Sequence, residues 1–384
     1  KPENQFPLNG GQQQRRQARL FFPYRDQNIF LGQPVKHVQQ EILISCLHEF
    51  IAGKVRIVSP MPHSWIMAID LSFMSRGFFL FTMLSTKRTN APIYLSNECV
   101  NQCLYCGFRA NNKTPRKTLN KKEFKAELDV LIKKGFQNIL LVSGENRKAV
   151  GMDYLKEIIL LAQKKCSYIA LEIYSLSKEE YKILRELGVN GVTFYQETYN
   201  KDVYDKAHFS GTKKDFYNRL DTPDYIGLAE YRNIGIGALL GLGDWRAEAG
   251  YLGLHAQYLM KTYWKSKISI SFPRLSDAPK NFDIPHRVSD KHLAQMMLAL
   301  RIFLHDAGIV ISTREPKSLR DNLLGLGVTQ ISAGSKTMPG GYSSNNGLEQ
   351  FKVHDNRPVE EFFEVLKQRG FDPVWKDWEE VFNK

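Results

Sequence analysis

From residue 92 onward, short apolar runs rich in β-branched and aromatic residues alternate with longer amphipathic segments. This alternation is typical of βα units arranged around a parallel sheet. Eight such units within about 250 residues match the size of a (β/α)8 TIM-type barrel. An open doubly wound sheet is the alternative, but no glycine-rich dinucleotide motif follows the first run. The eight runs are 92–97, 138–145, 168–175, 191–198, 235–241, 267–274, 308–315 and 328–335.

The segments between these runs carry helix signals. In residues 120–136, apolar side chains recur at helical spacing and Gly135 provides a stop. Segment 177–188 opens with Ser177 and Glu180, which have the spacing of a capping box. The predicted helices are 120–136, 153–165, 177–188, 248–264 and 289–308, with 357–370 closing the ring.

We expect a barrel domain over residues 91–384 and a partly helical N-terminal extension over residues 1–90. The first residues of the extension, roughly thirty, are polar and predicted to be poorly ordered. Its most apolar stretch, 64–84, contains Asp70 and Arg76. Because each charge would cost a few kcal/mol in hydrocarbon, we interpret this stretch as a buried amphipathic helix and expect no contact with a membrane.

The formal net charge is +13, which raises the question of nucleic-acid binding. Residues 1–90 hold eleven Lys and Arg against five Asp and Glu, so +6 of the charge lies there. The remaining +7 is spread without dense basic runs, and no RNA-binding module is recognisable in residues 1–90. We therefore interpret the charge as a Lys-rich soluble surface and expect no nucleic-acid partner.

Three of the five cysteines fall within eight residues, in the pattern Cys99-x3-Cys103-x2-Cys106, while Cys46 and Cys166 are isolated. Five cysteines in a chain of 384 residues do not form a disulfide framework, and this favours a reducing compartment. No signal peptide is visible, so we expect a cytoplasmic location, or an organelle stroma or matrix if a transit segment was removed.

The odd number of clustered cysteines suits a [4Fe–4S] cluster, which takes one thiolate per iron. Three ligands leave one iron open to an exogenous ligand. Zinc is the competitor, because Cys3His sites exist, but no histidine lies nearby and the spacing is not that of a zinc knuckle.

Polar, small or ionisable residues stand at the ends of seven of the eight runs. In a (β/α)8 barrel the carboxyl ends of the strands and the loops that follow them form one rim, where chemistry takes place. A shared site there explains the pattern better than seven separate helix caps. The residues are Cys99, Cys103, Cys106, Ser143, Gly144, Glu145, Glu172, Ser175, Gln196, Glu197, Pro273, Arg274, Thr313, Arg314, Glu315 and Ser332–Ser335.

The cysteine pattern, with the aromatic Tyr105 before the last cysteine, resembles that of radical S-adenosylmethionine enzymes. Further segments in order from residue 92 to 378 resemble the 2-iminoacetate synthase family, the tyrosine lyases of thiamine biosynthesis. Residues 1–63 show no such resemblance. The segments are PIYLSNECVNQCLYCGFR, PRKTL, VSGE, VGMDY, YQETY, DFYNRLDTPD, IGIGALLGL, SFPRL, STRE, SAGSKTMPGGY and WKDW.

The resemblance implies a role for each of these rim residues. Cys99, Cys103 and Cys106 would hold the cluster, and S-adenosylmethionine would chelate the open iron through its methionyl group. Arg314 and Ser332 would bind the carboxylate of the amino-acid substrate, because arginine fits a carboxylate through two parallel hydrogen bonds. The alternative for Arg314 is a structural ion pair with Glu315. The residues expected to contact S-adenosylmethionine are Tyr105 at the adenine, Gly144 and Glu145 at the amino group, Arg274 at the carboxylate, and Glu172, Gln196 and Glu197.

The implied reaction begins with a low-potential electron that splits the sulfonium into methionine and a 5′-deoxyadenosyl radical. That radical would take a hydrogen atom from L-tyrosine, and the Cα–Cβ bond would break to give 2-iminoacetate (dehydroglycine) and 4-cresol. The expected partners are an NADPH-fed flavodoxin or ferredoxin type of donor and the thiazole synthase that consumes the imine. His208 and His255 are candidates for the phenolic proton, with a packed or solvated histidine as the alternative.

Three rivals remain from the resemblance. A tyrosine-cleaving maturase of iron-only hydrogenase uses a further C-terminal cysteine cluster, whereas no cysteine follows Cys166 here. A tryptophan lyase shares TRE but lacks the YCGF and GSKT-PGGY segments. An RNA-modifying radical enzyme would need the RNA-binding module that residues 1–90 do not show.

Overall fold

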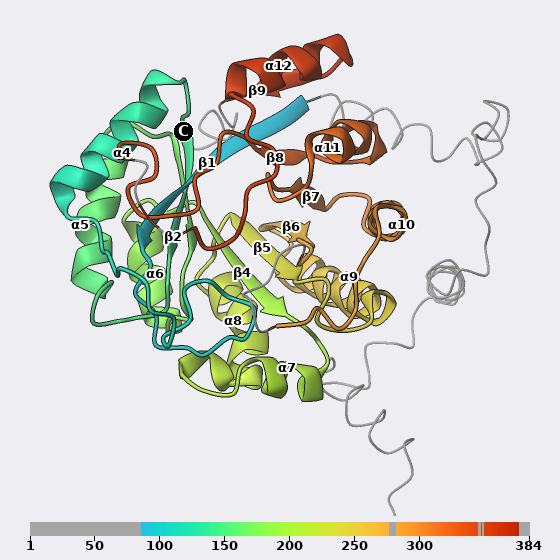
Figure 1. The fold of residues 1–384 in the computed structure, drawn as a ribbon, viewed down its shortest axis with the longest axis horizontal. Helices are drawn as coiled ribbons and strands as arrows, with labels where there is room; N and C mark the ends of the chain where they lie inside the picture. The colour runs from blue at the N-terminus through green and yellow to red at the C-terminus, as the bar shows by residue number, and fades with distance from the viewer. Residues whose placement is uncertain (1–85, 276–281, 345–346, 348, 376–384) are drawn as a thin grey trace, which may run out of the picture. The chain divides into compact units, whose positions relative to one another are not determined.

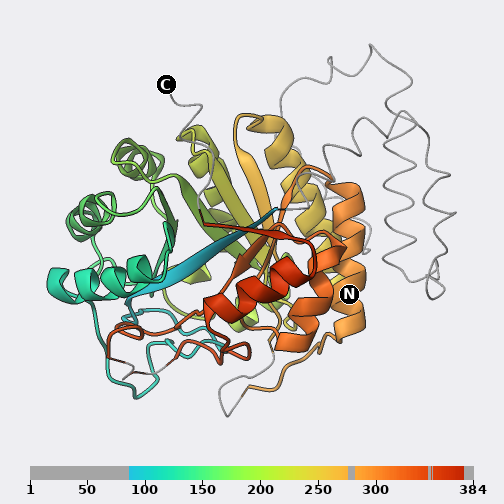
Figure 2. The same cartoon turned by 90° about the horizontal axis from the view of Figure 1, so that it is seen from above.

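A closed parallel barrel forms the part of the chain that the computed structural model describes, residues 86–275, 282–344, 347 and 349–375 (Figure 1). The strands follow the order β2-β3-β4-β5-β6-β7-β8-β1, and β1 pairs with β2 to close the ring. Helices follow the strands along the chain and cover the outside of the sheet (Figure 2). The predicted (β/α)8 barrel is therefore confirmed.

Each of the eight predicted strands is present near its predicted position. Apart from β1, the strands are slightly shorter than the apolar runs, and most of the runs continue beyond the end of the strand into the rim. The strands are β1 Thr86–Ser96, β2 Asn138–Ser143, β3 Tyr168–Glu172, β4 Gly191–Glu197, β5 Asn233–Ala238, β6 Lys267–Ser271, β7 Gly308–Ile311 and β8 Gln330–Ser332.

The six predicted helices are also present, and both local signals hold. Ser177 and Glu180 form the capping box of α6, and Gly135 has a φ of 89° just after α4. Three of the described helices, α7, α8 and α11, were not predicted. Helices α7 and α11 are short, and α8 contains Pro223, a residue type that argues against a helix. The helices are α4 Lys121–Lys133, α5 Met152–Ala162, α6 Lys178–Glu186, α7 Lys201–Ala207, α8 Phe216–Leu228, α9 Trp245–Thr262, α10 Asp290–Phe303, α11 Lys317–Leu323 and α12 Val359–Gln368, with short 3-10 turns η3 Thr212–Lys214 and η4 Leu324–Leu326.

Strand β1 begins six residues earlier than its apolar run. Its polar first half pairs with β8 and with an additional strand, β9 (Asp372–Val374), which follows α12. Lys87 is buried there, with its ammonium 4.2 Å from the centre of the Phe371 ring. A buried lysine in a strand gives no apolar signal, so the sequence pattern missed this half of β1. The rest of the predicted extension, including the stretch 64–84, lies outside the described residues.

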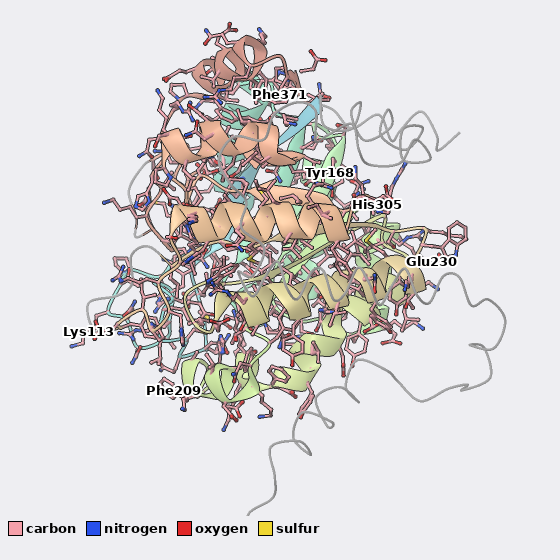
Figure 3. The ribbon with its side chains drawn as sticks, turned by 90° about the vertical axis from the view of Figure 1, so that its right-hand side faces the viewer. Lys113, Tyr168, Phe209, Glu230, His305 and Phe371 are labelled. Atoms are coloured by element: carbon pink, nitrogen blue, oxygen red, sulfur yellow. The ribbon has the colours of Figure 1, made fainter. Side chains whose placement is uncertain are left out.

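The two ends of the barrel have different roles. In Figure 3, Lys113 and Phe209, which belong to loops after β1 and β4, lie at one end; Tyr168, Glu230 and His305, at or before the amino ends of strands, lie at the other. The end with Lys113 carries the predicted rim residues. None of the helices in the described ranges is long and apolar enough to cross a lipid bilayer.

Candidate active site

The loop after β1 carries the clustered cysteines and is tied to two other segments by backbone hydrogen bonds. The Val100 amide donates to the Glu145 carbonyl, after β2, at 3.0 Å. The Leu104 amide donates to the carbonyl of Ala207, the last residue of α7, at 3.1 Å. These bonds hold the cysteine loop against the loops that follow β2 and β4, at the rim.

Gly144 allows this close packing. A Cβ at residue 144 would lie 2.2 Å from the Glu98 carbonyl oxygen, far inside van der Waals contact. The Gly144 amide donates to the Ser96 carbonyl at 2.9 Å, just where the β1–β2 register shifts. Any side chain at residue 144 would therefore push the cysteine loop away from β2.

All three clustered cysteines are free thiols. Burial raises the pKa of Cys103 and of Cys106, so a cation is needed to hold these groups as thiolates. Within the described ranges no group of three or more His, Cys, Asp or Glu is arranged to hold a metal ion. A [4Fe–4S] cluster makes a different demand, because each thiolate binds a separate iron. Soft, buried sulfur ligands of this kind fit an iron–sulfur cluster.

A buried network of four charges lies beside the cysteines. Arg219, from α8, donates to Glu145 Oε1 at 3.1 Å and lies 3.4 Å from Glu197 Oε1. Lys213, from η3, donates to Glu197 Oε1 at 2.6 Å. Burial raises the pKa of Glu197, but Lys213 and Arg219 outweigh it and hold that pKa below its usual value. Asn101 also donates to Glu145 Oε2 at 2.9 Å, so hydrogen bonds fix the orientation of both carboxyl groups.

The end of β4 is strained and holds unsatisfied polar atoms. Glu197 has a φ of 71°, unusual for a residue with a side chain, at the point where the β4–β5 register shifts. Neither amide atom of the buried Gln196 has a hydrogen-bond partner among the described residues. Buried polar atoms without partners mark a place where a ligand would supply them.

Glu172, at the end of β3, lines the same cavity as the three cysteines. Burial, and then the negative charge of Glu197, raise the pKa of Glu172 to about 7. Its carboxyl group is therefore partly protonated near neutral pH, unlike the carboxylate of Glu197.

Tyr105, in the cysteine loop, packs against an apolar cluster of Ala207, Leu239, Leu242, Leu275 and Ile284. Its hydroxyl group is 2.7 Å from His208 Nε2, and His208 Nδ1 is 2.9 Å from the Tyr204 carbonyl. Burial lowers the pKa of His208 to about 3, so the ring is neutral and Nε2 accepts from Tyr105. Because the Tyr105 ring packs on apolar side chains, it suits contact with a flat heterocyclic group.

His255, the second histidine considered for proton transfer, is buried behind β4. Its Nδ1 lies 2.9 Å from the Tyr199 hydroxyl, and burial lowers its pKa to about 4. Both histidines are thus packed and hydrogen-bonded, as in the alternative reading of the sequence.

Arg314 and Ser332 come together at the ends of β7 and β8. The Ser332 hydroxyl accepts a hydrogen bond from the Thr313 amide at 3.0 Å. The guanidinium carbon of Arg314 lies 3.6 Å from the centre of the Phe351 ring. Arg314 Nε is buried without a hydrogen-bond partner in the described part of the chain, and burial lowers the pKa of this residue. A half-buried guanidinium that stacks on an aromatic ring and has an unused buried donor can bind an anion.

The structure does not contain the Arg314–Glu315 ion pair that was the alternative reading of Arg314. Glu315 instead accepts from Arg274, and the two side chains are 6% and 12% exposed, respectively. Arg274 also donates to the Val288 carbonyl and lies 2.8 Å from Asp290 Oδ1. The guanidinium of Arg274 is therefore already engaged by protein groups on the side of β6 and β7.

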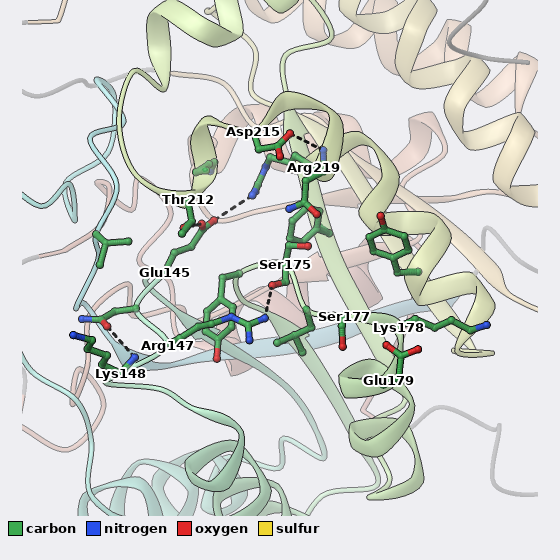
Figure 4. A pocket seen from close by; sticks show the side chains of 18 residues that line it. Glu145, Arg147, Lys148, Ser175, Ser177, Lys178, Glu179, Thr212, Asp215 and Arg219 are labelled. Carbon is green, nitrogen blue, oxygen red and sulfur yellow. Dashed lines mark hydrogen bonds and ion pairs between the residues drawn. The ribbon is translucent and has the colours of Figure 1, made fainter. Parts of the chain in front are cut away.

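Two cavities meet at the charge network. The smaller, of about 90 Å³, is lined by the three cysteines together with Glu172, Glu197 and Gln350. The larger, of about 730 Å³, lies between the loops after β2 and β3 and the start of α8 (Figure 4). Glu145, Phe194, Lys213 and Arg219 line both. The cysteines line the smaller cavity, so the chemistry expected from the sequence belongs there and the larger cavity is its neighbour.

Sequence reasoning missed several residues of this rim. Lys213 and Arg219 both follow β4, and Arg219 lies in a segment quoted for its resemblance, but nothing in their spacing indicates buried ion pairs. Tyr94, Gln350 and Phe351 were also missed; Tyr94 reads as an ordinary strand residue. Gln350 and Phe351 lie beyond the last predicted strand, so the order of strands along the chain does not indicate that these residues reach the rim.

Two known protein families match segments of this chain. Residues 93–243 match the family described as Radical SAM superfamily, and residues 271–372 match the family described as Biotin and Thiamin Synthesis associated domain. Together they cover most of the barrel; the first half of β1 and all of β6 but Ser271 lie outside the matched ranges. Membership of the radical SAM superfamily implies a [4Fe–4S] cluster and S-adenosylmethionine as cofactors.

Among curated proteins, the chain is 41% identical over 290 residues to 2-iminoacetate synthase of Salmonella typhimurium, covering 75% of this chain and 77% of the relative. It is 39% identical over 295 residues to 2-iminoacetate synthase of Escherichia coli, covering 76% and 78%. Among solved structures, the FeFe-hydrogenase maturase HydG from Carboxydothermus hydrogenoformans is 31% identical, with a TM-score of 0.74, covering 96% of this chain and 84% of that one.

Proposed function

We propose that this chain, which belongs to the 2-iminoacetate synthase family of radical S-adenosylmethionine enzymes, cleaves the Cα–Cβ bond of L-tyrosine. The products are 2-iminoacetate and 4-cresol, and the imine supplies the thiazole moiety of thiamine. The single observation that carries the proposal is that one rim holds three free cysteines, of which Cys103 is buried and the other two half-buried, and an arginine, Arg314, whose buried Nε has no hydrogen-bond partner among the described residues. The three cysteines suit an iron–sulfur cluster, and the arginine suits the carboxylate of an amino acid.

Cys99, Cys103 and Cys106 would ligate the cluster and leave one iron for S-adenosylmethionine. When bound, these two groups supply the one-electron chemistry that removes a hydrogen atom from tyrosine. The protein's own part is to hold the thiolates apart on one loop and to bury them. The packing of Gly144 against Glu98 supports this, because it leaves no free space between the cysteine loop and the end of β2.

S-adenosylmethionine would lie across the ends of β2 to β5. Glu145 would accept hydrogen bonds from the methionyl ammonium, because Arg219 and Asn101 fix the orientation of its carboxyl group. Tyr105 and its apolar cluster would face the adenine. The unpaired amide of Gln196, together with Glu197, would hydrogen-bond the rest of the cofactor. Glu172 stays a candidate contact, and Arg274 would have to leave Glu315 to reach a carboxylate.

The carboxylate of L-tyrosine would bind Arg314 through its free Nε donor, with Ser332 beside it. Phe351 would keep the guanidinium plane fixed from behind, so that the substrate is oriented as well as bound. A closed barrel below the rim excludes water from the reacting atoms.

The proposed partners are a low-potential electron donor of the flavodoxin or ferredoxin type and the thiazole synthase that consumes the imine. The excess positive charge would favour docking of an acidic donor. Loss of association at moderate salt, measured by co-elution, is the expected behaviour of such a contact.

The test uses anoxically reconstituted protein. Iron and sulfide are counted, and the electron paramagnetic resonance spectrum of the reduced protein is recorded before and after S-adenosylmethionine is added. The protein is then given tyrosine, S-adenosylmethionine and dithionite, and 4-cresol and 5′-deoxyadenosine are measured together. We expect four irons per chain, a spectrum that responds to the cofactor, and both products. Deoxyadenosine without cresol from tyrosine, but with a product from tryptophan, would reassign the substrate.

A further inference from the structure

Residues 349–355, called here the return segment, pass between the cysteine loop and Arg314. A Cβ at Gly107, which directly follows Cys106, would lie 2.8 Å from the Gln350 carbonyl oxygen and 3.0 Å from that of Glu349. The return segment therefore packs directly on the cysteine loop, and a glycine is needed for it to do so. The Gln350 amide donates to the Thr337 carbonyl at 2.9 Å, which anchors the segment to the rim after β8.

The side chain of Gln350 connects Tyr94 with Cys106. The Tyr94 hydroxyl donates to Gln350 Oε1 at 2.7 Å. This bond orients the carboxamide, so that Gln350 Nε2 faces Cys106 Sγ at 4.0 Å. Tyr94 itself is 4% exposed and packs with Phe108 and Val142 against Cys99 and Cys106. One carboxamide thus touches a cysteine of the cluster motif and a tyrosine of the barrel interior.

The next residue, Phe351, faces the other site. Its ring stacks under the guanidinium of Arg314 at 3.6 Å. The amides of His354 and Asp355, further along the return segment, both donate to the Thr313 carbonyl at 3.1 Å, beside Arg314. Arg314 and Tyr94 also interact electrostatically, since the guanidinium opposes the rise that burial causes in the pKa of Tyr94. The return segment is therefore a shared wall of the cysteine site and the Arg314 site.

A hydrogen bond to a cluster sulfur changes the reduction potential of the cluster. The reduced cluster carries one more negative charge than the oxidised one. An N–H group aimed at a ligand sulfur stabilises that charge and so raises the potential. A contact of 4.0 Å is long for such a bond and has room to shorten.

We propose that Gln350 is a positioning residue that links substrate binding to reduction of the cluster: tyrosine bound at Arg314 orders Phe351 and presses the neighbouring Gln350 carboxamide onto Cys106 Sγ. This inference rests on the proposed function, because it needs a cluster on Cys106 and a carboxylate on Arg314. Its consequence is that the one-electron reduction that initiates chemistry becomes easier once the substrate is in place.

The experiment is a redox titration of the reconstituted full chain, followed by electron paramagnetic resonance, with and without saturating L-tyrosine and without S-adenosylmethionine. In the wild-type chain we expect tyrosine to raise the midpoint potential. A tenfold change in the equilibrium constant for reduction corresponds to about 59 mV for one electron. In Gln350→Leu we expect a lower potential and no response to tyrosine. Gln350→Glu, which keeps the length and the acceptor for Tyr94 but lacks the N–H donor, should behave in the same way.

Phe351→Leu separates the two halves of the inference. It should keep the potential measured without tyrosine, because Gln350 is intact, and lose the response to tyrosine. The matched control is Gln163→Leu, an exposed glutamine at the end of α5 whose amide donates to the Leu187 carbonyl; both its potential and its response should equal those of the wild type.

Gln350 variants with the wild-type potential and the wild-type response to tyrosine would overturn the inference while leaving the proposed function intact. A wild-type chain that forms no cluster, or makes no cresol, would remove the proposed function and the inference together. Thermal unfolding of each variant, compared with the wild type, shows whether a lost response reflects a lost fold; Gln350→Glu preserves the shape of the side chain for this purpose.

Discussion

Arg219 donates to Glu145 across 74 residues of sequence, at 3.1 Å, and both side chains are nearly inaccessible to solvent. The same guanidinium approaches Glu197. One cation from α8 therefore bridges the two carboxylates that follow β2 and end β4, and Lys213 supplies the second positive charge at Glu197. The contacts with Arg219 fix the orientation of both carboxylates at the rim.

Replacement of this arginine should cost far more stability than loss of a surface ion pair. Arg219→Met leaves two buried carboxylates with less compensation, and we expect the free energy of unfolding to fall by about 3–5 kcal/mol. The matched control is Arg147→Met, which breaks the more exposed pair with Glu180 and should cost less than about 1 kcal/mol. Anoxic urea denaturation of both variants measures the difference. Equal losses would show that the buried network contributes nothing beyond a surface pair.

Cluster binding should depend on the clustered cysteines alone. Cys106→Ala removes a soft ligand that no neighbouring cysteine replaces, so we expect loss of the cluster absorbance, of bound iron and of 4-cresol formation. Cys166→Ala, a half-buried free thiol outside the motif, is the control and should retain all three. Iron and sulfide counts after reconstitution check this. Full iron content in Cys106→Ala would rule out the assigned ligand.

Substrate binding should distinguish arginine from lysine at residue 314. Lysine keeps the positive charge but lacks the planar pair of donors and the stacking on Phe351. We expect Arg314→Lys to raise the KM for tyrosine by roughly tenfold or more, since one charge-assisted hydrogen bond contributes about 1.5–3 kcal/mol. The affinity for S-adenosylmethionine should be unchanged. Steady-state cresol assays, with the exposed Arg369→Lys as control, give the comparison; an unaltered KM would count against a carboxylate at this position.

Stability should depend on pH through Glu172. Its pKa is about 7 in the folded chain, above the value of 4.5 for an unburied carboxyl group, so the folded state holds a proton that the unfolded state releases. The free energy of unfolding therefore falls as pH rises from about 4.5 to 7 and then levels off. Glu172→Gln carries no titratable group there. We expect the free energy of the variant minus that of the wild type to increase over this window, by up to about 3 kcal/mol.

Denaturation curves of the cluster-free protein at pH 5, 6, 7 and 8 test this sign. Because other groups titrate equally in both proteins, the difference between the two curves isolates residue 172. A difference that shrinks with rising pH would mean that Glu172 is stabilised as an anion in the folded chain.

Much of the architecture follows from local pattern. Alternating apolar runs and amphipathic segments specify strands and helices because each element must bury one face, and eight such pairs close into a barrel. The capping box of Ser177 and Glu180 and the stop at Gly135 act within a few residues, so the sequence predicts them without tertiary information. The spacing of the three cysteines is likewise local, since a single loop carries all three thiols.

Only the tertiary structure decided which charges meet. Glu315 pairs with Arg274, whereas its chain neighbour Arg314 stacks on Phe351 and keeps a buried Nε without a partner in the described residues, because the two adjacent side chains meet different neighbours. Tyr94 and Gln350 are 256 residues apart, and their contact depends on the path of the return segment over the cysteine loop. Residue type and spacing along the chain determine which elements form. The three-dimensional path of the loops determines which polar groups share a buried space, and no local pattern encodes that path.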